Sequence, residues 1–110
     1  MIFRNSQIVD ALNNLPLLAN VNLPVQVTYA IKKNHRKFVT EYQDYDEQLQ
    51  DLRVKYPDQK ELEESEELKE LLAIEVDIDI FKIPESTFMT GNFNITPSQI
   101  EILEFMIETE

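Results

Sequence analysis

The chain has 110 residues, 43% of them hydrophobic, which suffices for one modest core and excludes a disordered chain although 28% of the residues are charged. It contains no cysteine and one glycine, which excludes disulfides, thiolate metal sites and glycine-rich phosphate loops. The net charge of −11 is divided unevenly, at +4 over residues 1–40 and −15 over residues 41–110, so the summed field opposes general binding of nucleic acid.

The amino-terminal residues predict a strand, a helix and a connector. Residues 1–4 suit a short strand. Asn5 and Ser6 are candidate N-caps for the helix that follows, and Pro16 ends that helix after apolar residues at helical spacing. The mostly apolar residues 17–23 predict a connector that is buried on at least one side.

A helical hairpin is predicted in the middle of the chain. Pro24 suits a helix start, and no further helix breaker occurs before Pro57. Apolar and aromatic residues alternate four and three apart in a coiled-coil-like seam formed by Ile31, His35, Phe38, Tyr42, Tyr45, Leu49, Leu52 and Tyr56. A helix over residues 24–56 is about 50 Å long, which exceeds the width of a small domain. A second helix over residues 61–72 would lie back on the seam, giving a projecting antiparallel hairpin at about residues 24–73.

From residue 74 the apolar period changes to two, which predicts a half-buried strand over residues 74–80. Its outward positions are the carboxylates Glu75, Asp77 and Asp79. The phase slips at residues 80–81, which indicates a bulge or the end of the strand.

The carboxyl-terminal part predicts a loop and a helix. Residues 85–94 suit a loop or short hairpin with Phe88, Met89 and Phe93 turned inward, and Thr96 begins a capping box for the last helix. The chain as a whole therefore predicts one helix-rich α+β domain over residues 1–110. In this domain, a small antiparallel sheet of about two or three strands carries helices on one side, and the helical hairpin projects from it.

Two features bear on metal or catalytic chemistry, and each has a simpler interpretation. His35 is the only histidine, and at a seam position it most simply fixes helix register or marks where the partner helix ends. Glu75, Asp77 and Asp79 offer the oxygen ligands that Mg²⁺ takes, but no lysine stands in a nuclease pattern with them, and alternating acids also suit a solvated strand face. We therefore expect no catalytic residue, no metal and no cofactor.

The basic residues of the first half form one patch, Lys32, Lys33, Arg36 and Lys37, which share a helix surface because residues three and four apart are neighbours. This patch would suit a phosphate, an acidic partner or the acids of a second copy. The alternative is a solvated face that pairs with the acids of its own chain.

The acidic hairpin is the strongest surface feature. Its predicted contact surface for a partner comprises Asp44, Asp46, Glu47, Asp51, Glu61, Glu63, Glu64, Glu66, Glu67 and Glu70. The simplest interpretation is a solvated projecting arm. The functional interpretation is recognition of a basic groove, including one that normally holds nucleic acid, because rows of carboxylates can stand in for backbone phosphates.

Four segments occur in an order that carries a resemblance: residues 10–15 (DALNNL), 23–34 (LPVQVTYAIKKN), 75–83 (EVDIDIFKI) and 95–108 (ITPSQIEILEFMIE). In this order the chain resembles a family of short proteins, without an assigned activity, encoded by tailed phages of Gram-positive bacteria. The resemblance implies a phage origin and action inside the bacterial host, and it carries over no catalytic residues. It is weakest over residues 39–72, so it implies nothing about the acidic hairpin.

Two functional hypotheses follow. The first is a phage-encoded, non-enzymatic module that binds a protein, inhibiting or modulating a host protein or defence complex through its acidic surface. The second is a virion or tail assembly accessory that forms a homo-oligomer through the long-helix seam, sharing Phe38, Tyr42 and Tyr45 between chains. No apolar run approaches the ~20 residues of a membrane helix, and residues 1–6 show no signal-peptide pattern. We therefore expect a protein partner, no membrane, and a location in the cytoplasm of the bacterial host.

Overall fold

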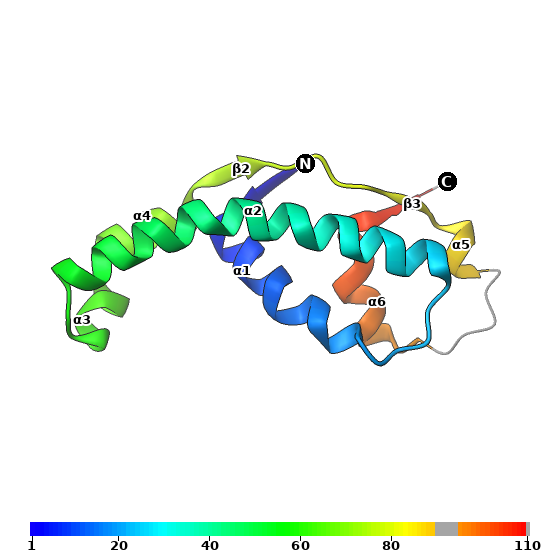
Figure 1. The fold of residues 1–110 in the computed structure, drawn as a ribbon, viewed down its shortest axis with the longest axis horizontal. Coiled ribbons are helices and arrows are strands. Elements are labelled where there is room, and N and C mark those ends of the chain that lie inside the picture. Colours follow the sequence, from blue (N-terminus) through cyan, green and yellow to red (C-terminus); the bar gives the residue numbers. More distant parts are fainter. Residues whose placement is uncertain (90–94, 110) are drawn as a thin grey trace.

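A single long helix sets the shape of the molecule. The computed structural model describes residues 1–89 and 95–109, and its helix α2 (Val25–Lys55) has 31 residues, which corresponds to a length of about 46 Å. The molecule measures 51 × 25 × 19 Å, and its radius of gyration of 16.4 Å exceeds the roughly 13 Å of a compact chain of this length. Figure 1 shows the reason, since the second half of α2 leaves the main body and carries α3 and α4 as an arm.

The amino-terminal prediction of a strand followed by a helix is confirmed. Strand β1 (Ile2–Arg4) leads into α1 (Asn5–Asn14) and a 3-10 helix, η1 (Leu15–Leu18). The predicted N-cap is wrong, because Arg4 occupies that position and its backbone N–H donates to Gln7 Oε1 at 2.8 Å. Asn5 has another partner: its Nδ2 donates to the carbonyl oxygen of Leu71 at 2.9 Å.

The projecting hairpin is present, but its shorter arm consists of two helices. The predicted single helix over residues 61–72 is wrong, since α3 (Gln59–Glu64) ends at Ser65 and α4 (Glu66–Ala73) begins there. Ser65 has an extended backbone, and its hydroxyl accepts from the Leu68 N–H at 3.2 Å, which caps α4. The break places α3 at the tip of the arm (Figure 1).

The strands form two pairs instead of one sheet. Strand β2 (Glu75–Asp77) pairs antiparallel with β1, placing Phe3 opposite Val76. Strand β3 (Ile83–Pro84) pairs parallel with β4 (Ile107–Glu108), a contact that the sequence did not predict. Figure 1 shows α1 below the β1–β2 pair, while α5 lies beside β3, and the mixture of helices with two small strand pairs confirms the helix-rich α+β class.

The predicted strand over residues 74–80 is too long, because regular pairing ends at Asp77. Beyond it, the backbone of Phe81 bonds to a side chain instead of a strand. The Phe81 N–H donates to Asn34 Oδ1 at 2.8 Å, and Asn34 Nδ2 donates to the Phe81 carbonyl at 2.9 Å. Asn34 is fully buried on α2, whereas His35 is only half-buried. The seam prediction is therefore wrong in the first turns of α2, where the buried polar residue is Asn34.

The carboxyl-terminal helices complete the main body. The short helix α5 (Ser86–Met89) occupies part of the predicted loop, and Phe88 is half-buried there, while the predicted positions of the Met89 side chain and Phe93 lie outside the described part. The capping box before α6 (Pro97–Leu103) is confirmed, with Thr96 N donating to Gln99 Oε1 at 2.9 Å. A 3-10 helix, η2 (Glu104–Met106), connects α6 to β4.

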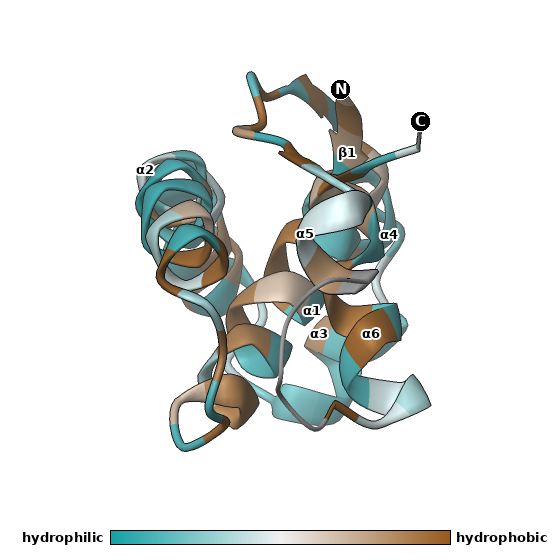
Figure 2. Ribbon diagram, turned by 90° about the vertical axis from the view of Figure 1, so that its right-hand side faces the viewer, coloured by the Kyte–Doolittle hydropathy of each residue, from teal (hydrophilic) through white to brown (hydrophobic). Residues whose placement is uncertain are grey.

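Two hydrophobic cores correspond to the body and the arm. The body core joins α1, α2 and α6, and its rings Phe3, Phe38 and Phe105 meet edge to face at centroid distances of 5.3–6.1 Å. Figure 2 looks along the long axis and shows α2 on one side with α1, α5 and α6 on the other. The arm core is smaller and lies between α2, α3 and α4, where its buried members are Tyr45, Leu52, Leu62 and Leu71.

Candidate protein-binding surface

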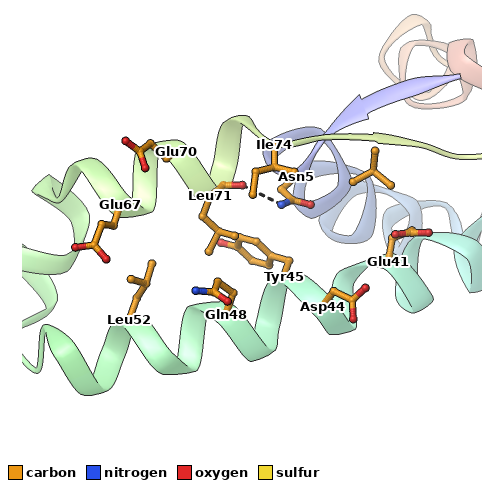
Figure 3. A pocket seen from close by; sticks show the side chains of 11 residues that line it. Asn5, Glu41, Asp44, Tyr45, Gln48, Leu52, Glu67, Glu70, Leu71 and Ile74 are labelled. Atoms are coloured by element: carbon orange, nitrogen blue, oxygen red, sulfur yellow. Dashed lines mark hydrogen bonds between the residues drawn. The ribbon is translucent and has the colours of Figure 1, made fainter.

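An acidic groove runs between α2 and α4 at the base of the arm (Figure 3). Its volume is about 590 Å³. Tyr45, Leu52 and Leu71 form an apolar floor and are 5–9% exposed, because they also belong to the arm core. The rim carries four carboxylates, Glu41 and Asp44 from α2 and Glu67 and Glu70 from α4, and no basic residue of the described chain lines the groove. The groove, defined by these residues, therefore combines apolar surface with a single sign of charge.

Asn5 fixes the end of the groove that adjoins the main body. This residue is 5% exposed and lines the groove from the start of α1. Its side chain donates to the Leu71 carbonyl, one of the last carbonyls of α4, and its backbone N–H donates to the Ile74 carbonyl at 3.0 Å. The carboxyl end of α4 is thus tied to α1, so α4 and α2 hold a defined separation where the groove lies.

Among the described residues, Glu67 is the rim carboxylate that has an ion-pair partner. Lys55 Nζ lies 2.6 Å and the Tyr56 hydroxyl 2.9 Å from Glu67 Oε1. The hydrogen bond from Lys55, then that from Tyr56, lowers the pKa of the Glu67 carboxyl, and the same contact raises the pKa of Lys55. Glu67 therefore stays ionised and bridges α4 to the end of α2, leaving the other three rim carboxylates without an ion pair in the described residues.

The ten acidic residues predicted as a contact surface all lie on the arm, but they do not form one site. Three of them, Asp44, Glu67 and Glu70, line the groove, to which the structure adds Glu41. The others lie around the arm outside the groove, and all are exposed except the half-buried Asp46: Asp46, Glu47, Asp51, Glu61, Glu63, Glu64 and Glu66. Three of these have neighbours on their own helix, through the pairs Gln50–Asp46, Gln59–Glu63 and Lys69–Glu66.

The predicted basic patch is divided between two environments. Lys33 and Lys37 are half-buried against the segment after β2, where Lys33 Nζ lies 5.3 Å from the Phe81 ring centroid and Lys37 donates to the Asp79 carbonyl. Lys32 and Arg36 are exposed beside a different groove on the far side of α2 from that segment. Half of the patch therefore stabilises the fold, and the other half remains accessible.

The structure also bears on the predicted strand carboxylates and on the predicted seam of α2. Glu75, Asp77 and Asp79 are exposed, and Asp77 lies 2.8 Å from the Met1 amine. Among residues 1–89 and 95–109, no three His, Cys, Asp or Glu side chains are grouped to hold a metal ion. Two of the three seam residues that a homo-oligomer would share are covered by the chain itself, since Phe38 is 0% and Tyr45 9% exposed, whereas Tyr42 is half-buried.

Comparison of the chain with family models, curated proteins and solved structures finds no match. No helix in the described part combines the length and apolar character needed to cross a bilayer. The function therefore has to be argued from the surface.

Proposed function

We propose that this chain is a non-enzymatic module that binds a protein through the acidic groove and the carboxylates around it. The observation that carries the proposal is the combination found in the groove, an apolar floor with Glu41, Asp44 and Glu70 on its rim, none of which forms an ion pair within the described part of the chain. Apolar surface supplies binding free energy when it is covered, and the carboxylates select a basic side chain over an acidic one. An arginine matches both, because its stem packs on apolar surface while its guanidinium binds carboxylates.

The charge of the arm supports a basic partner. Residues 41–72 contain twelve acidic and four basic residues, a net charge of −8. Such a concentration of one sign steers a basic surface toward the arm and speeds encounter at low ionic strength. A protein surface that normally holds nucleic acid is basic. The acidic arm could therefore inhibit such a protein by mimicking nucleic acid, and this is one form of the proposed function.

The resemblance to phage proteins gives the proposal its setting. A phage protein without chemistry of its own acts on its host by occupying a host surface, so we place the partner among the proteins of the bacterial cytoplasm. The second hypothesis, assembly through the seam, has less support because Phe38 and Tyr45 offer little free surface. Sedimentation of a monomer across a wide concentration range would argue further against it.

The test compares two variants with the same change in charge. The tagged protein is used to recover partners from a lysate of a Gram-positive host at low and high salt, and the experiment is repeated with Asp44→Lys/Glu70→Lys in the groove and with Glu101→Lys/Glu104→Lys on exposed positions of the body. We expect salt-sensitive recovery by the parent, loss in the groove variant and retention in the body variant. Equal recovery by both variants would refute the role of the groove.

A further inference from the structure

A second groove lies on the main body, on another face of α2. It is formed by η1 and the connector before α2 on one side and by the first half of α2 on the other, and its volume is about 500 Å³. Leu15 and Leu18 are nearly buried at its floor, and Val21, Leu23 and Ile31 are half-buried along its walls. Figure 2 shows the connector as a largely hydrophobic segment beside the amino end of α2. A volume of this size and an apolar lining are typical of small-molecule sites.

The polar rim of this groove is entirely basic or neutral. Lys32, His35 and Arg36 line it from consecutive turns of α2, and no acidic residue of the described chain lines it. This agrees with the uneven division of charge along the chain, since residues 1–40 carry a net charge of +4 while the whole chain carries −11. The described residues offer these three side chains no hydrogen bond or ion pair, in contrast to Lys33 and Lys37 on the neighbouring face.

We propose that this groove binds a small anionic amphiphile, that is, an apolar chain ending in a carboxylate. The apolar chain would lie along Leu18, Val21 and Ile31, and the carboxylate would bind Lys32 and Arg36 at the rim. Arginine suits this end group because its planar guanidinium donates two parallel hydrogen bonds to one carboxylate. The proposal concerns a different surface from the acidic groove and does not depend on it.

The size of the groove favours one extended alkyl chain as its ligand over a helix of a partner protein. An α-helix is 10–12 Å wide with its side chains, so two turns of helix occupy roughly 1,000 Å³. That is about twice the volume of the groove, and most of such a helix would remain outside it. An extended alkyl chain needs far less width and reaches the buried floor at Leu15 and Leu18.

Calorimetric or NMR titration with decanoate tests the proposal, using decylammonium and decanol as probes of equal chain length. We expect the parent to bind decanoate at least about tenfold more tightly than either control, as one charge-assisted hydrogen bond accounts for about a factor of ten. Decyl phosphate is a further probe, and it separates a carboxylate preference from general affinity for oxyanions. Equal binding of decylammonium, or tighter binding of decyl phosphate than of decanoate, would overturn the assignment of the ligand.

Three variants locate the site. Arg36→Gln should weaken decanoate binding about tenfold or more, whereas Lys60→Gln, an exposed position on the arm with the same change in charge, should leave it unchanged. Ala19→Trp fills the groove from an exposed position and keeps its charges, so binding should be lost while the unfolding temperature is retained. Unchanged decanoate binding by a folded Ala19→Trp variant would refute the site, as would binding of an acidic amphipathic peptide in place of decanoate.

Discussion

Replacing Asn34 gives the sharpest test of how the main body is held together. In the Asn34→Ala variant, the N–H and the carbonyl of Phe81 both lose their partner, at 2.8 and 2.9 Å in the parent. A buried backbone group left unsatisfied costs about 1–3 kcal/mol. Both hydrogen bonds are only partly buried, so water can reach the Phe81 groups. We therefore expect each group to cost an amount in the lower part of this range, and the two together to cost about 2–4 kcal/mol. This is a large share of the 5–15 kcal/mol that stabilises a typical domain.

Thermal unfolding followed by circular dichroism measures this loss. A destabilisation of 2–4 kcal/mol should lower Tm by roughly 8–16 °C in a domain of this size. Asn13→Ala is the matched control, since Asn13 is an exposed helical asparagine and its replacement should change stability by no more than about 0.5 kcal/mol. Hydrogen exchange at the Phe81 amide supplies a local readout, with faster exchange expected in the variant. An unchanged Tm together with unchanged protection of Phe81 would refute the assigned role of Asn34.

Three further predictions concern the arm. Ser65→Ala removes the N-cap of α4 and should cost about 1 kcal/mol, measured by thermal unfolding against Ser98→Ala at an exposed position. Glu67→Gln should lower Tm at pH 7, and the difference from the parent should shrink as the pH falls below the usual range of a glutamate, because the folded-state pKa of Glu67 is lowered and its stabilisation is lost as the pH falls through that value; a difference that does not change with pH would contradict this. Burial raises the pKa of the Tyr45 phenol, and the hydrogen bond to Glu67 raises the pKa of the Tyr56 phenol, so ultraviolet titration should show two tyrosines ionising above the usual value near 10. Tyr45→Phe should remove one of the two, and the fold should weaken as the pH rises through this range.

Signals that act over neighbouring residues were sufficient to predict most helices. Pro16 and Pro24 bracket the first connector, and the Thr96 capping box begins α6, as expected from their local geometry. The break at Ser65 had a local signal too, since a serine followed by Glu66 and Glu67 is a typical helix start. The regular apolar spacing of residues 61–72 concealed it, because the same leucines pack on α2 in either arrangement.

The buried asparagines had no such signal. Asn34 and its partner Phe81 are 47 residues apart, and Asn5 and Leu71 are 66 apart, so neither pair can be recognised from local spacing. Strand β2 ends where its pairing with β1 ends, at the Ile2–Asp77 pair, and the backbone of Phe81 then bonds to the Asn34 side chain, neither of which an alternating pattern reveals. The acidic groove, too, could be predicted from the sequence only in part. Charge along the sequence predicted an acidic arm, but the choice of Glu41, Asp44 and Glu70 as its rim depends on where Asn5 ties α4.

Repulsion between the like charges of the arm opposes its folding, and this repulsion links the stability of the arm to the binding of a partner. Its core is small, while residues 41–72 carry a net charge of −8 around it, and like charges closer than the ~8 Å screening length repel one another at physiological salt. The Lys55–Glu67 pair offsets this at the far end, and Asn5 anchors the near end without using charge. Between them, Glu41, Asp44 and Glu70 are held around an apolar floor, and no cation of residues 1–89 or 95–109 forms an ion pair with them. A basic partner that enters the groove would therefore gain attraction and relieve repulsion within the arm at once, which is the physical reason for assigning the binding surface to this groove and not to the more heavily charged tip.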